Sequence, residues 1–135
     1  MGLSMKKPSK QWTEFGQLID VVDIRIGKQQ RKLAKLNLRH QELLDSIEAS
    51  WASIANEQQR LKSLVVEDEF NGLSRLFQRR ESVKSHIESL FFDVSVTQQN
   101  ANELAAEIAL VIVEKRRQEK RKDALAEIQE QLRDE

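Results

Sequence analysis

Apolar residues recur at alternating steps of three and four along most of the chain, the spacing of an α-helical coiled coil. The first such run covers residues 12–65. Its central seam positions are Leu33, Asn37, His40, Leu44, Ile47, Trp51, Ile54, Gln58, Leu61 and Val65. Seven of these ten residues are apolar. A repeat sustained over several heptads predicts one continuous helix that packs against a partner along a narrow seam.

A second run with the same spacing covers residues 69–133 and predicts a second helix. Its seam positions are Leu73, Leu76, Arg80, Val83, Ile87, Leu90, Val94, Thr97, Ala101, Leu104, Ile108 and Val111, ten of them apolar. Beyond Val111 the same steps pass through Lys115, Gln118 and Lys122 before they reach Leu125 and Leu132. We therefore expect the seam to weaken there and the C-terminal part of this helix to lie exposed as a single helix.

The two runs match when residues are paired so that their numbers add up to 134. Trp51 then faces Val83, and Asn37 faces Thr97. Registers shifted by seven residues fit as well, and a short turn at 66–68 selects this one. Asp68 would cap the second helix at this turn. The predicted fold is all-α, a long two-helix antiparallel coiled-coil hairpin over residues 12–135.

The residues before the hairpin, 1–11, are predicted to form a flexible basic lead-in that contains the chain's one proline. Ser9 or Thr13 can cap the helix that follows, because a hydroxyl oxygen accepts a hydrogen bond from a free backbone N–H of the first turn.

Composition supports long helices and narrows the possible functions. Charged residues make up 33% of the chain, only four Gly interrupt it, and the 22 basic residues balance the 22 acidic ones. A net charge of zero gives no general attraction to nucleic acid. The apolar stretch from Ile108 to Val113 is far too short to span a bilayer, which needs about 20 residues. We expect a cytoplasmic protein without direct membrane insertion.

The usual signatures of catalysis and of cofactor binding are missing from the sequence. Cysteine is absent, and no glycine-rich phosphate loop, nucleophile elbow or metal-spaced His or acid cluster occurs. The two histidines, His40 and His86, fall on different predicted helices and have no acidic partner at a useful spacing. We expect no enzymatic activity, no cofactor and no metal site.

Basic residues gather in two segments that would lie near the same end of the hairpin. Residues 115–122 contain six basic residues in eight, and another six lie between Arg25 and Arg39. Three interpretations remain open: a solvated surface balanced by Glu and Asp, a nucleic-acid-binding helix, and a docking surface for an acidic protein. Nucleic acid is the least favoured partner, because neither a one-sided basic field nor stacking aromatic residues accompany these segments.

Apolar residues also occur in excess of what one seam can bury. Phe91, Phe92 and Val96 fall beside the second seam, and Leu36, Leu38 and Leu43 fall beside the first. Such residues form either a wide seam with scattered exposed side chains or a broader surface for a partner or for self-association.

Several stretches resemble a known family. The first helix opens with residues 18–25 followed by the basic segment 28–36, and the second opens with 67–70, Leu73, Leu76, Arg79, Arg80, Val83 and Ile87. This layout, with a terminal run of Lys, Arg, Glu and Gln, is similar to the FliJ/YscO family of type III export stalk proteins, in particular to its secretion-system branch associated with virulence. The likeness covers about residues 13–133.

The resemblance implies a stalk that catalyses nothing and promotes protein transport. The paired termini would enter the hexameric ring of the export ATPase, and the hairpin would link that ring to the export-gate membrane protein. Secretion chaperones are further partners of some members. The candidate ring contacts are Lys28, Arg31, Lys115, Arg116, Arg117, Arg121 and Lys122. The acidic tip at 67–69, with Phe70 and Leu73, would face the gate. The alternative functions are a generic dimerising coiled-coil scaffold and, less favoured, a nucleic-acid-binding basic helix.

Overall fold

The computed structural model describes residues 9–66 and 70–134, and it consists there of two long helices, α1 (Lys10–Ser63) and α2 (Gly72–Asp134). The helices pack against each other, which confirms the predicted all-α helical hairpin. They are antiparallel, because Trp12 near the start of α1 contacts Gln129 near the end of α2, and Glu57 near the end of α1 contacts His86 in the first half of α2. Helix α1 begins at Lys10 and ends at Ser63, in each case two residues before the predicted boundary.

The helix starts follow ordinary capping chemistry. The Ser9 hydroxyl accepts a hydrogen bond from the Trp12 backbone N–H at 3.0 Å, so Ser9 is the N-cap of α1. Helix α2 begins at Gly72, three residues later than predicted, and the Asn71 carbonyl accepts its first helical hydrogen bond from Arg75 at 3.0 Å. Asn71 adopts a positive φ of 68°, which Asn tolerates better than most residues. The predicted cap, Asp68, and the acidic tip 67–69 lie outside the described residues.

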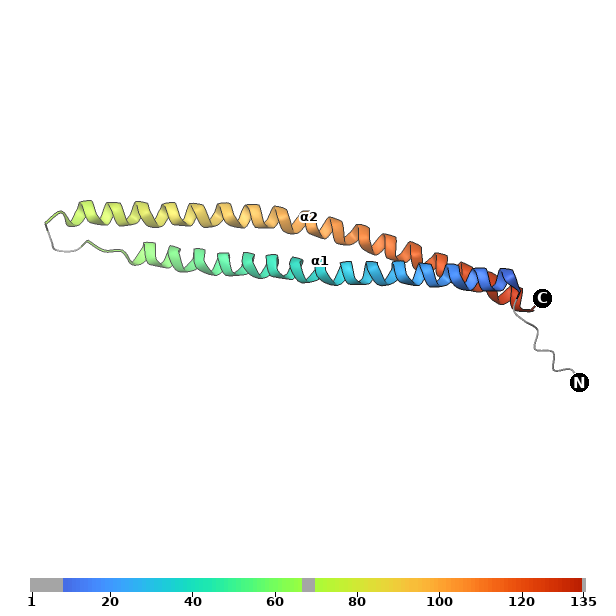
Figure 1. Cartoon of the computed structure of the whole chain (residues 1–135). Helices are drawn as coiled ribbons and strands as arrows, with labels where there is room; N and C mark the ends of the chain where they lie inside the picture. Colours follow the sequence, from blue (N-terminus) through green and yellow to red (C-terminus); the bar gives the residue numbers. More distant parts are fainter. Residues whose placement is uncertain (1–8, 67–69, 135) are drawn as a thin grey trace, which may run out of the picture. The chain divides into compact units, whose positions relative to one another are not determined.

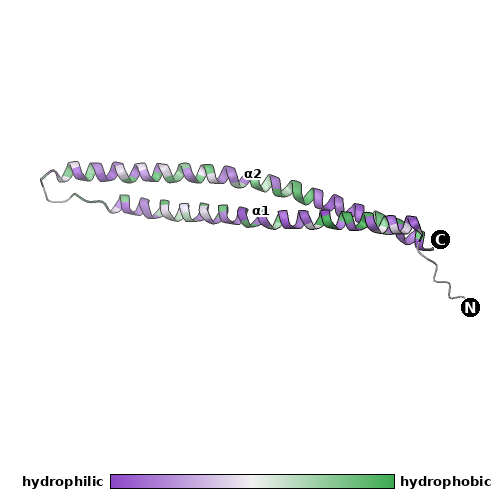
Figure 2. Cartoon of the chain, viewed as in Figure 1, coloured by the Kyte–Doolittle hydropathy of each residue, from purple (hydrophilic) through white to green (hydrophobic). Residues whose placement is uncertain are grey.

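The hairpin divides into two compact units. The loop unit contains residues 38–105, and the terminal unit contains residues 1–37 and 106–135, described from residue 9 to residue 134. Figure 2 shows that apolar and polar positions alternate along both helices. Each helix buries one stripe of apolar residues in the seam, and further apolar residues of both helices stay exposed.

The core of the loop unit is a continuous apolar seam, formed by Ile47, Ile54, Val83, Ile87, Val94 and Ala101, with Leu43, Leu61, Leu64 and Leu90 packed against them. On α2, the predicted seam positions from Val83 to Val111 are all buried or half-buried, so that part of the prediction is confirmed. Leu76 is half-buried as predicted, whereas Leu73 and Arg80 are exposed and Arg79 is half-buried in place of Arg80.

On α1 the predicted seam is half wrong. Leu33, His40, Ile47, Ile54 and Leu61 are buried or half-buried, as predicted. The positions between them are exposed: Asn37, Leu44, Trp51, Gln58 and Val65. The preceding residues take their places: Leu36, Leu43, Ser50, Glu57 and Leu64. From Leu33 onward, the seam residues of α1 are therefore spaced by three and then four residues, whereas the prediction spaced them by four and then three.

The predicted register is also wrong, by about one heptad. Trp51 contacts Phe91, and Glu57 contacts His86, so the paired numbers add up to 142 and 143 rather than 134. The reason is the connection, which is longer than the assumed tight turn. Leu64 packs on the core after α1 has ended, and the Val65 carbonyl accepts a hydrogen bond from the Arg79 guanidinium at 3.4 Å. The first turns of α2 thus extend beyond the end of α1 (Figure 1).

In the terminal unit, the C-terminal part of α2 is not the exposed single helix that we predicted. Val22, Ile26 and Val111 are buried, and Lys115, Gln118, Lys122 and Gln129 are half-buried. Two contacts join this part of α2 to α1, from Lys122 to Asp23 and from Gln129 to Trp12. The seam continues through these polar residues because the methylene stems of Lys and Gln can cover apolar surface while their polar ends reach a partner or water.

Candidate partner-binding surfaces

All seven predicted ring contacts lie in the terminal unit, four of them exposed without an ion pair to any described residue. Lys28 and Arg31 lie on α1, and Arg116 and Arg121 lie on α2. The remaining three residues each have an acidic partner within the chain, so the structure separates the predicted set into free and engaged cations.

Two of the engaged cations form short-range pairs along α2 itself. The Lys115 ammonium lies 3.5 Å from the Glu119 carboxylate, and the Arg117 guanidinium donates a hydrogen bond to Glu114 at 3.0 Å. Exposed pairs of this kind contribute only about 0.3–0.5 kcal/mol. A more strongly acidic partner can therefore displace Glu114 from Arg117 at little cost.

The third engaged cation, Lys122, has a structural role. Its ammonium lies 2.6 Å from the Asp23 carboxylate on α1. The hydrogen bond to Asp23, and then the negative charge of that carboxylate, raise the pKa of Lys122 above its ordinary value of 10.5. Lys122 therefore joins the two helices of the terminal unit, which makes it a poor candidate for contact with a partner.

Arg116 and Arg117 lie together on the outward face of α2. They line an open groove of about 290 Å³ with Val113 and Lys120. Three cations next to one apolar side chain can bind a carboxylate while an apolar group of the same partner rests on Val113. Sequence reasoning missed Lys120 and Val113 as members of this basic groove. The signal was present, because Arg116, Arg117 and Lys120 lie three, four and seven residues after Val113, and such spacings place residues on one helix face.

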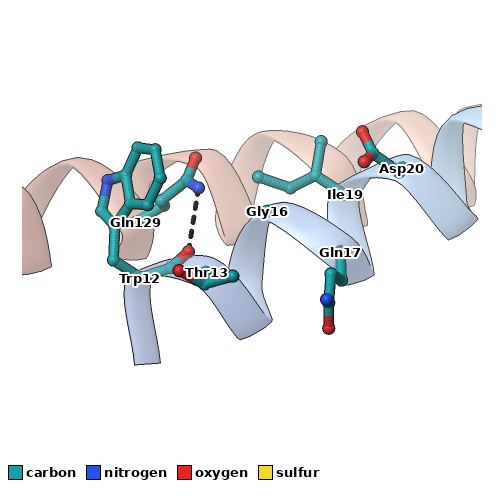
Figure 3. Close-up of a pocket in the computed structure, with 7 residues that line it drawn as sticks. All are labelled: Trp12, Thr13, Gly16, Gln17, Ile19, Asp20 and Gln129. Carbon is teal, nitrogen blue, oxygen red and sulfur yellow. Dashed lines mark hydrogen bonds between the residues drawn. The ribbon is translucent and has the colours of Figure 1, made fainter. Parts of the chain in front are cut away.

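A second, shallower groove lies where the helix ends of the terminal unit meet (Figure 3). Gln129 reaches across from α2 and donates a hydrogen bond to the Trp12 carbonyl at 3.1 Å. Gly16 leaves room for this approach, because a Cβ atom at that position would lie in tight contact, 3.0 Å, with the Gln129 amide nitrogen. The groove carries no cluster of charges, so we assign it the structural role of joining the ends of the two helices.

The two candidate gate contacts lie in the loop unit and are strongly exposed. Phe70 is 89% exposed and Leu73 is 74% exposed. Leu73 lies in the first turn of α2, and Phe70 directly precedes Asn71. Both apolar side chains are therefore accessible to a partner.

An aromatic contact lies beside the seam of the loop unit, where the sequence did not predict it. Trp51 and Phe91 meet edge to face, with ring centroids 5.6 Å apart and planes at 80°. Such pairs are worth about 0.5–1.5 kcal/mol beyond the area they bury. Trp51 was expected in the seam opposite Val83, and it is instead 48% exposed.

Other chemistry finds little support in the described part of the chain. The His86 Nδ1 atom lies 3.5 Å from the Glu57 carboxylate, and His40 is half-buried in the α1 seam. No group of three or more potential metal ligands occurs among residues 9–66 and 70–134. Across the same residues, neither helix contains a segment that is both long and apolar enough to cross a membrane.

Comparison with known proteins gives this chain no relative from which a role could be transferred. No family model matches it, and neither a curated protein nor a solved structure is significantly similar to it.

Proposed function

We propose that this protein is a central-stalk or adaptor protein of a bacterial type III secretion system, acting in the cytoplasm. In this proposal the terminal unit binds the hexameric export ATPase and the loop unit faces the export gate, with Phe70 and Leu73 as contacts. The protein itself performs no catalysis and promotes export through these contacts. Secretion chaperones are further candidate partners, as the resemblance implies.

The observation that carries the proposal is the position of the basic groove. The start of α1 and the end of α2 both belong to the terminal unit. In this unit Arg116, Arg117 and Lys120 of α2 line the basic groove. The proposal requires that a ring around the paired helix ends reach this groove, which ends 14 residues before the end of α2, and offer acidic side chains to it. Charge complementarity of this kind mainly speeds association and fixes orientation.

A capture experiment tests the partner directly. The tagged protein is incubated with native cytosol at moderate salt, and the bound proteins are identified by mass spectrometry. The proposal predicts that a hexameric export-type ATPase or an export-gate component is recovered. Recovery of neither would overturn the proposed function and leave the helical hairpin intact.

Charge reversal then tests the basic groove. The double variant Arg116→Glu, Arg117→Glu should weaken binding to the ATPase by at least about tenfold, which corresponds to about 1.4 kcal/mol. The matched control is Arg39→Glu, Arg60→Glu, which reverses two exposed charges of the loop unit. This control should bind the ATPase like the unmodified protein. Equal binding by both double variants would exclude the groove as the ring contact.

The dimerising scaffold remains the second candidate function. Exposed apolar residues beside the loop-unit seam favour it, since a two-stranded coiled coil does not need them.

A further inference from the structure

One stripe of α1 in the terminal unit carries positive charge and no negative charge. Its residues directly precede the seam residues of this helix, so they follow each other at steps of three and four and share one face. The stripe begins with two apolar residues and continues with four cations: Leu18, Val21, Arg25, Lys28, Lys32 and Lys35. All six side chains are exposed. We call the four cations the basic row and the two apolar residues its apolar start.

The basic row has no acidic residue to balance it. Between Asp23 and Glu42, α1 contains six basic residues and no acidic one. None of the four cations of the row forms an ion pair with a residue that the structure describes. Their charges therefore remain available to a partner.

Elsewhere on the two helices, cations are commonly paired with an acid on the same helix. Six of them have an acidic partner three or four residues away: Lys10, Arg60, Lys84, Lys115, Arg117 and Arg133. The basic row departs from this pattern, so it differs from an ordinary solvated helix surface with interspersed charges.

The arrangement destabilises the isolated helix. Cations three or four residues apart on a helix repel each other. Every neighbouring pair within the basic row has this spacing, and Arg31 lies three residues from Lys28 and four from Lys35. A solvated surface gains nothing from such repulsion, whereas an acidic partner would remove it on binding. The row therefore has the character of a binding surface.

The geometry of the row favours a helix as the acidic partner. A repeat of 3.5 residues keeps the row in line with the seam along a coiled coil, and the row is about 15 Å long from Arg25 to Lys35. A second helix in the same supercoil can place acidic residues at matching steps over this whole length. Coiled coils select their partners through charges in the rows that flank the seam.

The apolar start adds to this preference. Leu18 and Val21 are each 45% exposed, and they can pack against apolar residues of the same partner helix. A nucleic acid would use the cations alone, and the stripe has no aromatic residue on which bases could stack. The combination of an apolar start with a basic row is therefore matched best by an amphipathic helix.

We propose that the basic row and its apolar start form a docking site for an acidic amphipathic helix of another protein, which packs beside α1 as a third helix. The partner helix presents Asp or Glu to the basic row and apolar residues to Leu18 and Val21. The site includes Lys28, one of the candidate ring contacts. It does not rest on the proposed function, because it lies on α1, requires no ATPase ring and is separate from the basic groove of α2.

Two synthetic peptides of identical composition test the site. The matched peptide is a helix former of about 20 residues with glutamates and two leucines on one stripe at steps of three and four. Its isomer has the same residues, with the glutamates spread around the helix. By fluorescence anisotropy at physiological ionic strength, the matched peptide should bind at least about tenfold more tightly than the isomer. Equal binding would reflect general attraction between opposite charges and would overturn the proposal.

Charge reversal locates the binding. The double variant Lys28→Glu, Lys32→Glu should bind the matched peptide at least about tenfold more weakly than the unmodified protein. It should fold normally, because the new acids lie three or four residues from remaining cations, and its circular dichroism and melting temperature check this. The matched control, Lys62→Glu, Arg80→Glu, reverses two exposed cations of the loop unit and should bind the peptide like the unmodified protein. An equal loss in both variants would exclude the basic row as the site.

The apolar start and the class of partner are tested separately. Leu18→Gln, Val21→Gln should weaken binding of the matched peptide several-fold, and by a similar factor in high salt, because apolar contacts are not screened. A labelled single-stranded oligonucleotide is the competing probe. If it binds more tightly than the matched peptide and ignores the change at Leu18 and Val21, the row binds nucleic acid and the helix proposal is wrong. Failure to capture an ATPase bears only on the stalk, whereas failure of the matched peptide bears only on this site.

Discussion

At the scale of single residues, the neighbouring side chains Leu43 and Leu44 distinguish the observed seam from the predicted one. Leu43 packs against the buried core, whereas Leu44 is 38% exposed. Leu43→Ala should therefore lower the free energy of unfolding by about 2–3 kcal/mol, and Leu44→Ala by less than about 1 kcal/mol. Urea denaturation, at a protein concentration low enough to keep the chain monomeric, measures both changes in the free energy of unfolding. A larger loss for Leu44→Ala would restore the seam that the sequence predicted.

The seam was predicted wrongly at these positions because two alternative sets of residues, one position apart, contain equal numbers of apolar residues. The predicted set (Asn37, Leu44, Trp51, Gln58, Val65) and the observed set (Leu36, Leu43, Ser50, Glu57, Leu64) each contain three apolar residues among five. Residue type alone therefore does not choose between them. The position of Trp51 does distinguish them, because beside the seam its ring meets the Phe91 ring edge to face and keeps part of its surface in water.

At the scale of the helices, the hairpin, its direction and most of the α2 seam could be predicted, because a repeat near 3.5 residues admits few alternatives. The register could not, since every shift of seven residues fits the same repeat. The connection between the helices determines the register. Its position depends on the packing of Leu64 against the core and on the hydrogen bond from Arg79 to the Val65 carbonyl. The basic residues of the terminal unit could be recognised by their charge, but nothing in the sequence indicated that Lys122 pairs with Asp23 on the other helix.

The Lys122–Asp23 pair predicts how the helix ends respond to alkaline pH. The pKa of Lys122 is raised in the folded protein, so its stabilisation is fully present below its ordinary pKa of 10.5. It is lost as the pH rises through the higher, folded value. The melting temperature of the unmodified protein should exceed that of Lys122→Gln at neutral pH, and the difference should vanish under strongly alkaline conditions. Lys120→Gln is the control, since Lys120 has no ion pair to the described residues. An equal, pH-dependent loss in the control would show that the Asp23 contact is not the cause.

At the scale of the whole molecule, the two units differ in what their seams contain. The loop unit has a cluster of six buried apolar residues, whereas the seam of the terminal unit passes through Lys115, Gln118, Lys122 and Gln129. Gln118 donates a hydrogen bond to Glu114 at 2.9 Å, but its buried carbonyl oxygen has no partner. An unsatisfied buried acceptor costs about 1–3 kcal/mol, but the loop unit has one as well, on Glu57. The terminal unit should open locally more often than the loop unit because its seam contains fewer buried apolar side chains.

Amide hydrogen exchange measures this difference, because exchange reports local opening in each segment. Residues 10–37 and 106–134 should exchange faster than residues 38–63 and 76–105. Gln118→Leu removes the unsatisfied oxygen and adds apolar surface to the seam, so it should slow exchange in the terminal unit by about tenfold and leave the loop unit unchanged. Leu110→Gln, an outward change in the same unit, should have little effect. Uniform protection of both units, or a slowing that spreads equally into the loop unit, would show that the hairpin opens as one cooperative structure. A terminal unit that opens on its own would instead leave its helix ends free to separate and adjust when a partner binds the basic groove.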